Sequence, residues 1–285
     1  MMKEKLINLI PDKMFLKIKF YKIFKRKLDL SNPKTFNEKL QWLKLYDRKD
    51  IYTTMVDKYE VKKYVSNIIG EEYVVPILGI YDNFDEINFD ELPNQFVIKC
   101  THDSGGLVIV KDKNKFDVDS ARKKINECLK KNFYYIFREW PYKNVKPRIL
   151  IEEYMVDESG YELKDYKFFC FNGKVKLLFI ASDRNSNKET KFDFYDENFK
   201  HLPFTNGHPN SKRNIKKPKN YDKMKELAER LSGNLPQIRV DFYNINGRIY
   251  FGELTFYHWS GFVPFTPVEW DYRLGELIKL PKDDV

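Results

Sequence analysis

IRVDFYNINGRIYFGELTFYHWSGFVP, residues 238–264, contains the pair of strands from which the rest of the chain can be interpreted. Val, Ile, Phe and Tyr dominate the runs Ile238–Tyr243 and Arg248–Leu254, and these residue types favour strands. Asn246-Gly247 lies between the runs and is typical of a tight turn, because both residues tolerate positive φ. The stretch therefore predicts a β-hairpin.

Three charged residues, Arg239, Asp241 and Glu253, interrupt this otherwise apolar hairpin. Burying a charge costs free energy unless the charge is paired or binds a metal. Two carboxylates on neighbouring strands would form a site for a hard cation beside the fixed positive charge of the arginine. The alternative is that all three are solvated charges on an edge hairpin.

The type of turn decides which of these residues share a face of the sheet. A strict two-residue turn at Asn246-Gly247 would place Asp241 and Glu253 on opposite faces. A three-residue loop, with the glycine as a left-handed bulge residue, would place both on one face, with Glu253 opposite Arg239. We predict the three-residue loop.

Composition bounds the class of protein. The chain has 285 residues, of which 42% are hydrophobic, so it can bury a substantial core. No run of eighteen apolar residues and no secretory signal is visible, and Cys100, Cys128 and Cys170 are scattered within apolar runs. We therefore expect a cytoplasmic protein with reduced thiols.

The net charge of +9 bears on the partners. It suits anionic small molecules, an anionic glycan or the acidic inner face of a membrane. No recognised nucleic-acid-binding motif is present, so we expect no nucleic-acid partner.

The first 56 residues predict a basic helical region. Phe15, Ile18, Tyr21 and Phe24 recur at helical spacing with lysines between them. We expect this helix to pack on the protein with its lysines in water; a helix that lies on a membrane surface is the alternative. Thr35-Phe-Asn-Glu38 is a capping box that starts the next helix.

Residues 96–106, FVIKCTHDSGG, combine an apolar strand that contains Lys99 with a polar, glycine-containing loop. Adjacent glycines beside Ser and Thr let backbone N–H groups approach phosphate oxygens, and a lysine neutralises the phosphate charge. A Walker loop would open a helix, which this loop does not. The alternative is a simple hairpin loop with a lysine that extends into solvent.

Two further β-type stretches follow. Residues 148–154, RILIEEY, predict a strand that ends in two acids, and residues 165–181 predict a hairpin that turns at Asn172-Gly173. Asp165 and Lys167 share one face of this hairpin. The lysine is either one partner of a surface salt bridge or a phosphate ligand.

The order of these features resembles the ATP-grasp superfamily, which includes D-alanine–D-alanine ligase and other carboxylate–amine ligases. More closely, the chain resembles the TupA-like ATP-grasp family of bacterial surface-polysaccharide clusters, whose members are often labelled glycosyltransferases from genomic context. The resemblance covers essentially the whole chain. The stretches that carry it are NPKTFNEKLQWLKLYD, VDKYEVKKYV, VIKCTHDSGG, DYKFFCFNGKV and FGELTFYHWSGF.

The resemblance implies an α+β protein with the ATP-grasp fold: two α/β lobes with mainly antiparallel sheets that clasp ATP, plus a helical N-terminal region. We expect the N-terminal region at residues 1–56 and the N-terminal and lid lobe at residues 57–150, with the phosphate-binding loop at 99–106. We expect the C-terminal lobe at residues 151–285, with the metal-binding hairpin at 237–256.

For the nucleotide, the resemblance implies two phosphate-binding lysines, a flexible lid over the phosphates and an interlobe hinge that meets adenine. The phosphate-binding lysines are Lys58 and Lys99, and the lid is Ser104, Gly105 and Gly106. The hinge is Glu152, Glu153, Tyr154 and Met155. Asp165 is the implied ribose ligand, and Glu158 and Glu162 are alternatives because an insertion follows the hinge.

For the metal, Asp241 and Glu253 match the magnesium ligands of the superfamily, and Arg239 matches the arginine that stabilises the developing anion. Thr255 stands where the superfamily usually has Asn, so it would offer a single hydroxyl oxygen and no amide. The number of magnesium ions therefore stays open.

Three more residues have implied roles. Lys167 would contact a phosphate or the substrate and assist catalysis. His258 follows the metal-binding strand, where acceptor binding is expected, and Arg184 is a further substrate residue.

The resemblance therefore implies an ATP- and Mg²⁺-dependent ligase that forms an amide through an acyl phosphate. We expect it to attach an amino acid or amine to a sugar carboxylate or glycan intermediate of a capsular or other surface polysaccharide. One alternative is a glycosyltransferase that uses a nucleotide sugar, although Asp117-Val-Asp119 lies at a helix start and not at a strand end. The other is a non-enzymatic protein that binds a glycan or a membrane surface.

Overall fold

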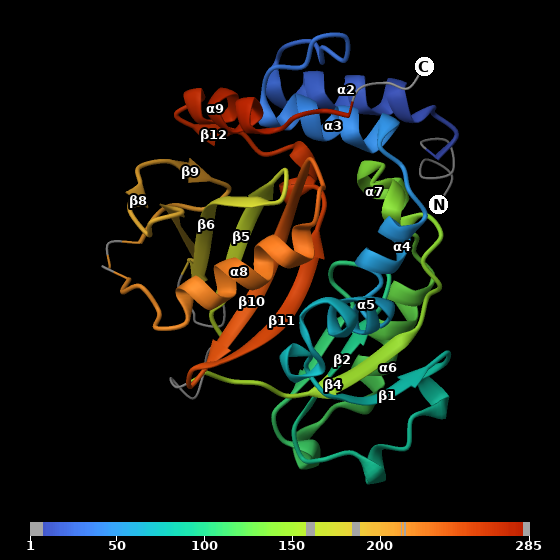
Figure 1. Ribbon diagram of the computed structural model, residues 1–285. Coiled ribbons are helices and arrows are strands. Elements are labelled where there is room, and N and C mark those ends of the chain that lie inside the picture. Colours follow the sequence, from blue (N-terminus) through green and yellow to red (C-terminus); the bar gives the residue numbers. More distant parts are fainter. Residues whose placement is uncertain (1–7, 158–162, 184–188, 212, 214, 282–285) are drawn as a thin grey trace. The chain divides into compact units, whose positions relative to one another are not determined.

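The computed structural model describes residues 8–157, 163–183, 189–211, 213 and 215–281, and it combines helices with antiparallel sheets (Figure 1). The predicted α+β class is confirmed. The chain forms two compact units: unit 1 is Met1–Arg48 with Lys164–Val285, and unit 2 is Lys49–Leu163. The N-terminal helical residues therefore group with the C-terminal half of the chain, which differs from the expected boundaries at residues 56 and 150.

Unit 1 is built on a six-stranded antiparallel sheet in the order β11-β10-β5-β6-β7-β8, with a separate short pair, β12-β9. Its strands are β5 (Asp165–Phe171), β6 (Lys174–Ser182), β7 (Lys191–Asp196), β8 (His201–Leu202), β9 (Thr205–Asn206), β10 (Gln237–Ile245), β11 (Arg248–Thr255) and β12 (Phe265–Thr266). Its helices are α2 (Asp12–Phe24), α3 (Phe36–Tyr46), α8 (Tyr221–Ser232), the short η6 (His258–Gly261) and α9 (Glu269–Leu277).

Two Asn-Gly turns form the hairpins of this sheet. Asn172 and Gly173 have φ of 48° and 79°, and Asn246 and Gly247 have φ of 50° and 85°. Positive φ at both central residues is the requirement of a type I′ hairpin turn. Ile245 pairs directly with Arg248, so the predicted three-residue loop is wrong and the turn is the strict one.

Helix α8 covers one face of the six-stranded sheet (Figure 1). Phe168 of β5 packs against Tyr221 of this helix, with ring centroids 5.8 Å apart, and the Cys170 thiol lies 3.6 Å from the carbonyl oxygen of Ala228. Because side chains alternate along a strand, Lys167 and Phe169 face the other side of the sheet.

Helix α3 begins as predicted. Thr35 accepts a hydrogen bond from the backbone N–H of Glu38, and the Glu38 carboxylate accepts one from the backbone N–H of Thr35, which completes the capping box. Phe36 is fully buried, and its ring meets that of Phe169 edge-on at 6.2 Å. Helix α3 thus packs on the sheet face opposite α8.

Helix α2 forms as predicted but buries a different face. Leu16 and Phe20 are its fully buried side chains, whereas Ile18 and Tyr21 are exposed. The two buried residues are four apart, which is one helical stripe. The expected inward stripe through Ile18 and Tyr21 is therefore wrong.

Unit 2 is a four-stranded antiparallel sheet in the order β1-β4-β2-β3. Its strands are β1 (Ile77–Tyr81), β2 (Phe96–Cys100), β3 (Leu107–Val110) and β4 (Ile149–Glu153). Its helices are α4 (Ile51–Val56), α5 (Glu60–Ile69), α6 (Val118–Leu129) and α7 (Tyr134–Phe137), with short turns η1 (Glu71–Tyr73), η2 (Phe84–Glu86), η3 (Phe89–Glu91), η4 (Lys113–Lys115) and η5 (Trp140–Tyr142).

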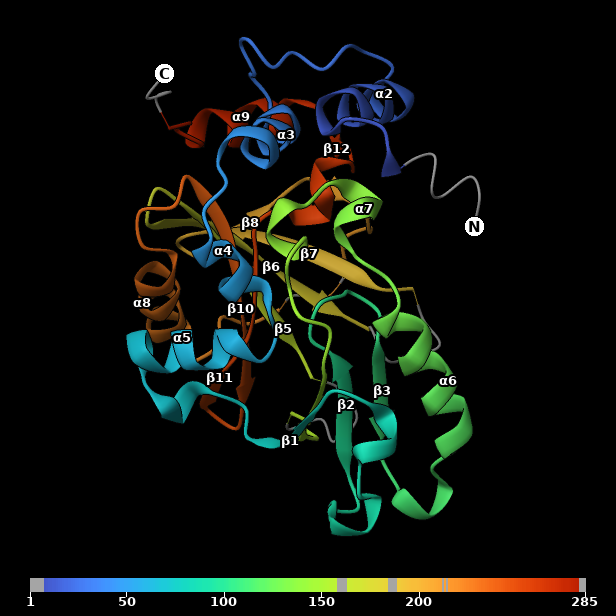
Figure 2. The same ribbon diagram turned by 90° about the vertical axis from the view of Figure 1, so that its right-hand side faces the viewer.

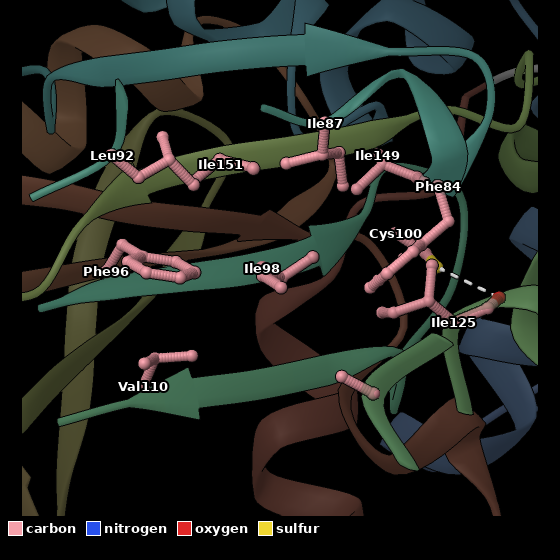
Figure 3. Close-up of a cluster of buried hydrophobic side chains, with 11 residues drawn as sticks. Phe84, Ile87, Leu92, Phe96, Ile98, Cys100, Val110, Ile125, Ile149 and Ile151 are labelled. Carbon is pink, nitrogen blue, oxygen red and sulfur yellow. Dashed lines mark hydrogen bonds between the residues drawn. The ribbon is translucent and has the colours of Figure 1, made fainter. Parts of the chain in front are cut away.

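Helix α6 lies beside β2 and β3 (Figure 2). Its Ile125 joins Phe96 and Ile98 of β2 and Ile149 and Ile151 of β4 in a buried apolar cluster (Figure 3). This core holds β2 and β4 in place, and both strands carry residues of the candidate site.

Within the described part of the chain, every helix is too short or too polar to span a bilayer.

Two glycines of unit 1 should respond differently to substitution by alanine. Gly261 has φ of 62°, and a Cβ there would lie 2.4 Å from Gln41 Nε2, whereas Gly247 has φ of 85° and its Cβ would meet only Asn220 Nδ2 at 3.8 Å. We expect Gly247→Ala to lower the free energy of unfolding by about 1 kcal/mol, the cost of left-handed backbone. Gly261→Ala adds a steric clash and should cost about 2–4 kcal/mol.

Urea titrations followed by tryptophan fluorescence measure both losses. Equal losses for Gly247→Ala and Gly261→Ala would contradict the proposed contact with Gln41.

Candidate functional site

A β-bulge in β11 puts both hairpin carboxylates on one face of the unit 1 sheet. Asp241 pairs with Glu253 and the next residue, Phe242, pairs with Phe251, so the pairing skips Gly252. The predicted same-face placement of Asp241 and Glu253 is confirmed, but its cause is this bulge and not the turn. Glu253 therefore lies opposite Asp241, and Thr255 takes the place opposite Arg239.

Strand β5 extends the charged face. Lys167 pairs with Asp241 across β5 and β10, and Asp165 lies two residues before Lys167, so it has the same orientation. With Arg239 and Glu253, the face carries three carboxylates and two cations, which leaves one negative charge in excess. Such a face favours a bound cation.

Arg239 connects both hairpin carboxylates. Its Nε donates to Asp241 Oδ1 at 2.7 Å and its Nη2 donates to Asp241 Oδ2 at 2.8 Å, a bidentate pair. The same Nη2 lies 2.7 Å from Glu253 Oε1 and 2.9 Å from Thr255 Oγ1. Charge-assisted bidentate contacts of this kind fix geometry as well as charge.

Asp241 is the buried centre of the cluster and Glu253 is its exposed edge. Lys167 Nζ donates to Asp241 Oδ2 and lies 3.6 Å from Asp165 Oδ1. Asp165, Lys167 and Asp241 are all buried, whereas 47% of the Glu253 side chain is exposed. Glu253 is therefore the carboxylate that a ligand from solvent would meet first.

A chain of hydrogen bonds orients Arg239 from behind. Arg239 Nη1 donates to His258 Nδ1 at 2.9 Å, and because arginine only donates, the ring proton must be on Nε2. Nε2 donates to Asn206 Oδ1 at 2.9 Å, and Asn206 Nδ2 donates to the carbonyls of Val263 and Pro264. Burial, and next the charge of Arg239, hold the pKa of His258 well below 6.5, so the ring is neutral.

The donor set of this face fits magnesium. Mg²⁺ prefers oxygen ligands and is usually bound through one or two carboxylates. Asp241, Glu253 and Thr255 offer carboxylate and hydroxyl oxygens, and Thr255 Oγ1 already lies 3.0 Å from Glu253 Oε1. The excess negative charge of the face acts in the same direction.

In unit 2, a buried carboxylate joins two lysines. Glu152 Oε2 accepts from Lys99 Nζ, and Glu152 Oε1 lies 2.5 Å from Lys62 Nζ, which also donates to the carbonyl of Val75 at 2.8 Å. Burial opposes the ionisation of Glu152, but the charges of Lys99 and Lys62 outweigh it, and the pKa of Glu152 lies below its usual value. Lys99 keeps 26% of its side chain exposed, so it can also reach an anion in solvent.

The glycine-containing loop is anchored by Asp103. Its carboxylate accepts from the backbone N–H of Gly106 at 2.9 Å, and its backbone carbonyl accepts from Lys58 Nζ. Ser104 and Gly105 between them are exposed. The structure therefore brings Lys58 to the loop while leaving the tip of the loop open to solvent.

A second group of possible metal ligands adjoins the glycine-containing loop and includes Asp103. Ligand atoms of Cys100, Asp103 and Cys128 lie within 4.8 Å of one another. Burial, aided by the charge of Asp103, raises the pKa of Cys100 to about 12, and burial also raises the pKa of Cys128. Thiols that stay protonated are poor ligands, and a Cβ on Gly106 would lie 2.7 Å from Cys100 Sγ, so we assign this group a packing role.

The remaining predicted residues fall into two sets. Glu153 ends β4 and is exposed, and Tyr154 and Met155 follow it, partly buried. Arg184, Glu158 and Glu162 lie outside the residues that the structure describes, so their predicted roles stay predictions.

Sequence reasoning missed two residues that the structure adds to the site. Lys62 lies on the same side of α5 as the buried residues Val65 and Ile69. A lysine at a position where the helical spacing predicts an apolar residue could have indicated that Lys62 is buried and paired. Asn206, which holds His258, lies 52 residues away in the sequence and gave no signal.

The chain belongs to the TupA-like ATP-grasp family, whose sequence profile matches residues 38–279. This range includes the charged residues of both candidate sites, from Lys58 to Glu253, and it confirms the resemblance stated above. A search of curated protein sequences finds no match.

Solved structures similar to the chain include three ligases. They are D-alanine–D-alanine ligase from Bacillus anthracis complexed with ATP (15% identity, 71% of this chain and 55% of that chain, TM-score 0.42), D-alanine–D-alanine ligase from Helicobacter pylori (18%, 86% and 69%, 0.41) and phosphoribosylamine–glycine ligase from Thermotoga maritima (13%, 73% and 49%, 0.46). The chain spans little more than half the length of the Bacillus anthracis ligase. The family assignment rests on the sequence match.

Glu152→Gln should destabilise the protein because it leaves Lys62 and Lys99 without their anion. We expect a loss of about 3 kcal/mol in the free energy of unfolding at pH 7. The pKa of Glu152 is lower in the folded protein than in the unfolded chain, where it is about 4.3. Ionised Glu152 therefore stabilises the folded state at pH values above about 4.3, and this stabilisation is lost as the pH falls through the lower, folded-state pKa. The difference between wild type and variant should therefore narrow in acid.

Urea unfolding from neutral pH into the acid range provides the measurement. Glu153→Gln, a change at the exposed neighbouring residue, is the matched control and should stay within about 0.5 kcal/mol of wild type. A Glu152→Gln protein as stable as this control at pH 7 would rule out the buried triad.

His258→Gln should change the pH dependence of stability. Because the folded pKa of His258 is lowered, the unfolded state takes up a proton near pH 6.5 that the folded state refuses, and wild-type stability falls below that pH. The slope from this residue is about 1.4 kcal/mol per pH unit. Unfolding curves between pH 7.5 and 5.5, roughly one unit on either side of the reference pKa, should show a shallower fall in the variant; identical slopes would mean that His258 is not held neutral.

Proposed function

We propose that the protein is an ATP- and Mg²⁺-dependent ligase that joins an amine, such as an amino acid, to a carboxylate through an acyl phosphate. The observation that carries this proposal is the cluster on the unit 1 sheet, where Arg239 contacts both Asp241 and Glu253 beside Lys167. Membership of an ATP-grasp family supports it.

The proposed reaction has two steps. In the first, a carboxylate oxygen attacks the γ-phosphorus of ATP, the bond to the β–γ bridging oxygen breaks, and ADP leaves. In the second, the amine nitrogen attacks the acyl carbon, phosphate leaves with the electrons of the C–O bond, and the amine proton passes to solvent. Little covalent help is needed from the protein, so positioning and charge stabilisation have to supply most of the acceleration.

Unit 2 supplies the groups that we assign to the phosphates. Lys99 is held by Glu152 and remains partly exposed, so its position is fixed before an anion arrives. Lys58 lies at the loop through its contact with Asp103. The exposed residues Ser104 and Gly105 would supply backbone N–H groups to the phosphate oxygens, and Gly106, whose N–H is bonded to Asp103, would hold the loop in shape.

For the nucleoside, we propose the contacts that the family resemblance implies, each within its own unit. Residues 152–155 would meet adenine, and Asp165 would bind the ribose. Because the Glu152 side chain is engaged by Lys62 and Lys99, its part in adenine binding would be through the backbone.

Unit 1 supplies the groups that we assign to the reacting centre. Asp241, Glu253 and Thr255 would hold magnesium, which would neutralise charge on the transferred phosphoryl group. Lys167 and Arg239 would place two further positive charges beside the developing anion. Both are already fixed by Asp241, so little reorganisation is needed during the reaction.

We propose a sugar carboxylate of a surface polysaccharide as the acceptor. Trp259 follows the metal-binding strand, is 39% exposed, and lies stacked 6.1 Å from the ring of Phe192, so it offers a flat apolar face next to the charged cluster. His258 has hydrogen bonds at both ring nitrogens, so we assign it a positioning role on Arg239 instead of direct contact with substrate. Arg184 remains a proposed substrate residue.

Glu253→Gln should lower the rate of ADP formation about a hundredfold while leaving the fold intact, because the side chain is half exposed and the amide removes only the charge. The assay measures ADP formed from ATP and Mg²⁺ in the presence of a uronic acid oligosaccharide and an amino acid. Glu226→Gln is the matched control, since its side chain is 52% exposed on α8 and is also ion-paired.

Two results would count against the proposal. One is wild-type ADP formation that does not depend on both the carboxylate and the amine. The other is calorimetric binding of a nucleotide sugar without binding of ATP, which would favour the glycosyltransferase alternative.

A further inference from the structure

Helix α2 carries apolar side chains on two opposite sides. Leu16 and Phe20 are fully buried in unit 1. Met14, Ile18 and Tyr21, at spacings of four and three, form a second stripe roughly opposite the first, and they are 56%, 41% and 56% exposed. Packing within unit 1 therefore accounts for one stripe of α2 and leaves the other in contact with solvent.

Lysines border the exposed stripe. Helical spacing places Lys17 on one side of the stripe and Lys22 on the other, and both are exposed, as are Lys13 and Lys25. Residues 8–28 contain seven basic residues and one acid, Asp12, which is paired with Arg48 at 2.7 Å. The stripe therefore lies in a strongly positive surface.

A surface hollow of about 220 Å³ adjoins the stripe. It is lined by Ile10, Phe15 and Ile18, with Lys19 and Lys22 at its polar edge. Lys19 Nζ lies 5.8 Å from the ring of Phe15, so an ammonium group stands directly beside apolar surface. This combination suits a ligand that is anionic at one end and apolar at the other.

We propose that the exposed stripe of α2 docks the protein on an anionic lipid bilayer. Met14, Ile18 and Tyr21 would enter the boundary between headgroups and acyl chains, and the bordering lysines would contact lipid phosphates. Large exposed apolar patches with a polar rim mark interaction sites, and a rim made of cations selects an anionic partner. This inference does not depend on the proposed enzymatic activity.

Two other partners for the stripe, a second copy of the chain and a nucleic acid, fit its charged and apolar residues less well than an anionic bilayer. A second copy of the chain also carries +9 and would bring like charges together across the interface. A nucleic acid would satisfy the lysines but not the three apolar side chains between them. An anionic bilayer satisfies both.

The test is co-sedimentation of the full chain with phosphatidylcholine vesicles that contain one third phosphatidylglycerol, compared with pure phosphatidylcholine vesicles. Binding should be confined to the anionic vesicles and should weaken as salt is raised. The triple variant Met14→Gln, Ile18→Gln, Tyr21→Gln should bind about tenfold more weakly. The triple variant Lys13→Gln, Lys17→Gln, Lys22→Gln should bind about a hundredfold more weakly, since each lysine contributes about fivefold.

Two control variants match the test variants, one in the exposure of the apolar residues replaced and the other in the number of positive charges removed. Val268→Gln with Tyr272→Gln removes comparably exposed apolar residues from unit 1, and Lys216→Gln, Lys219→Gln and Lys223→Gln removes the same charge elsewhere. Both control proteins should bind as wild type does, and urea unfolding should show that the stripe variant, which keeps Leu16 and Phe20, remains folded.

Three outcomes would overturn the proposal: no wild-type binding to anionic vesicles, full binding by the folded stripe variant, or equal binding to pure phosphatidylcholine vesicles. A dimer that the stripe variant loses, without any vesicle binding by wild type, would instead assign the stripe to self-association.

Discussion

The bidentate pair between Arg239 and Asp241 is the interaction on which the charged face of unit 1 depends. Both side chains are almost completely withdrawn from water, and removing one partner of such a pair costs about 3–5 kcal/mol. The pair also fixes register, because a one-residue slip of β10 against β5 would send Asp241 to the face opposite Lys167. The charged residues of the candidate site therefore also specify the alignment of the sheet.

The same cluster is held in place from α3 by a second set of polar contacts. Gln41 Nε2 donates to the carbonyls of Ser260 and Gly261, and Lys44 Nζ donates to that of Ser260 at 2.7 Å. Trp259 and Ser260 have φ of 50° and 55°, a conformation that costs about 1 kcal/mol or more per residue. The contacts of α3 offset this cost and fix the segment that begins with His258, the residue that orients Arg239. This explains why residues before position 49 form one unit with the C-terminal half.

Local chemistry made much of the fold predictable. Asn172-Gly173 and Asn246-Gly247 tolerate positive φ and therefore favour tight turns between strands, and the Thr35–Glu38 capping box is likewise a short-range signal. The bulge at Gly252 was not predictable, because it is defined by the pairing of two strands and not by one strand alone. The role of Asn206 was not predictable either, because its contact with His258 joins two segments that are distant in the sequence.

The burial of α2 shows a different limit. A helix with apolar residues on opposite sides has no single inward face in its sequence, so only its neighbours decide which stripe is buried. In the candidate site, the sequence shows which residues are charged, but it does not show which cation pairs with which carboxylate. Lys99 is paired with Glu152 because β2 and β4 are adjacent, and these strands are about fifty residues apart in the sequence.

The two units carry opposite signs of charge at their candidate sites. In unit 2, Lys62 and Lys99 share the single carboxylate of Glu152, which leaves one positive charge in excess. In unit 1, three carboxylates exceed two cations by one. A polyphosphate needs the first kind of site and a divalent cation needs the second, and a nucleoside triphosphate with its magnesium ion needs both. The complementary signs are a property of each unit by itself: cations exceed their carboxylate in unit 2, and carboxylates exceed their cations in unit 1.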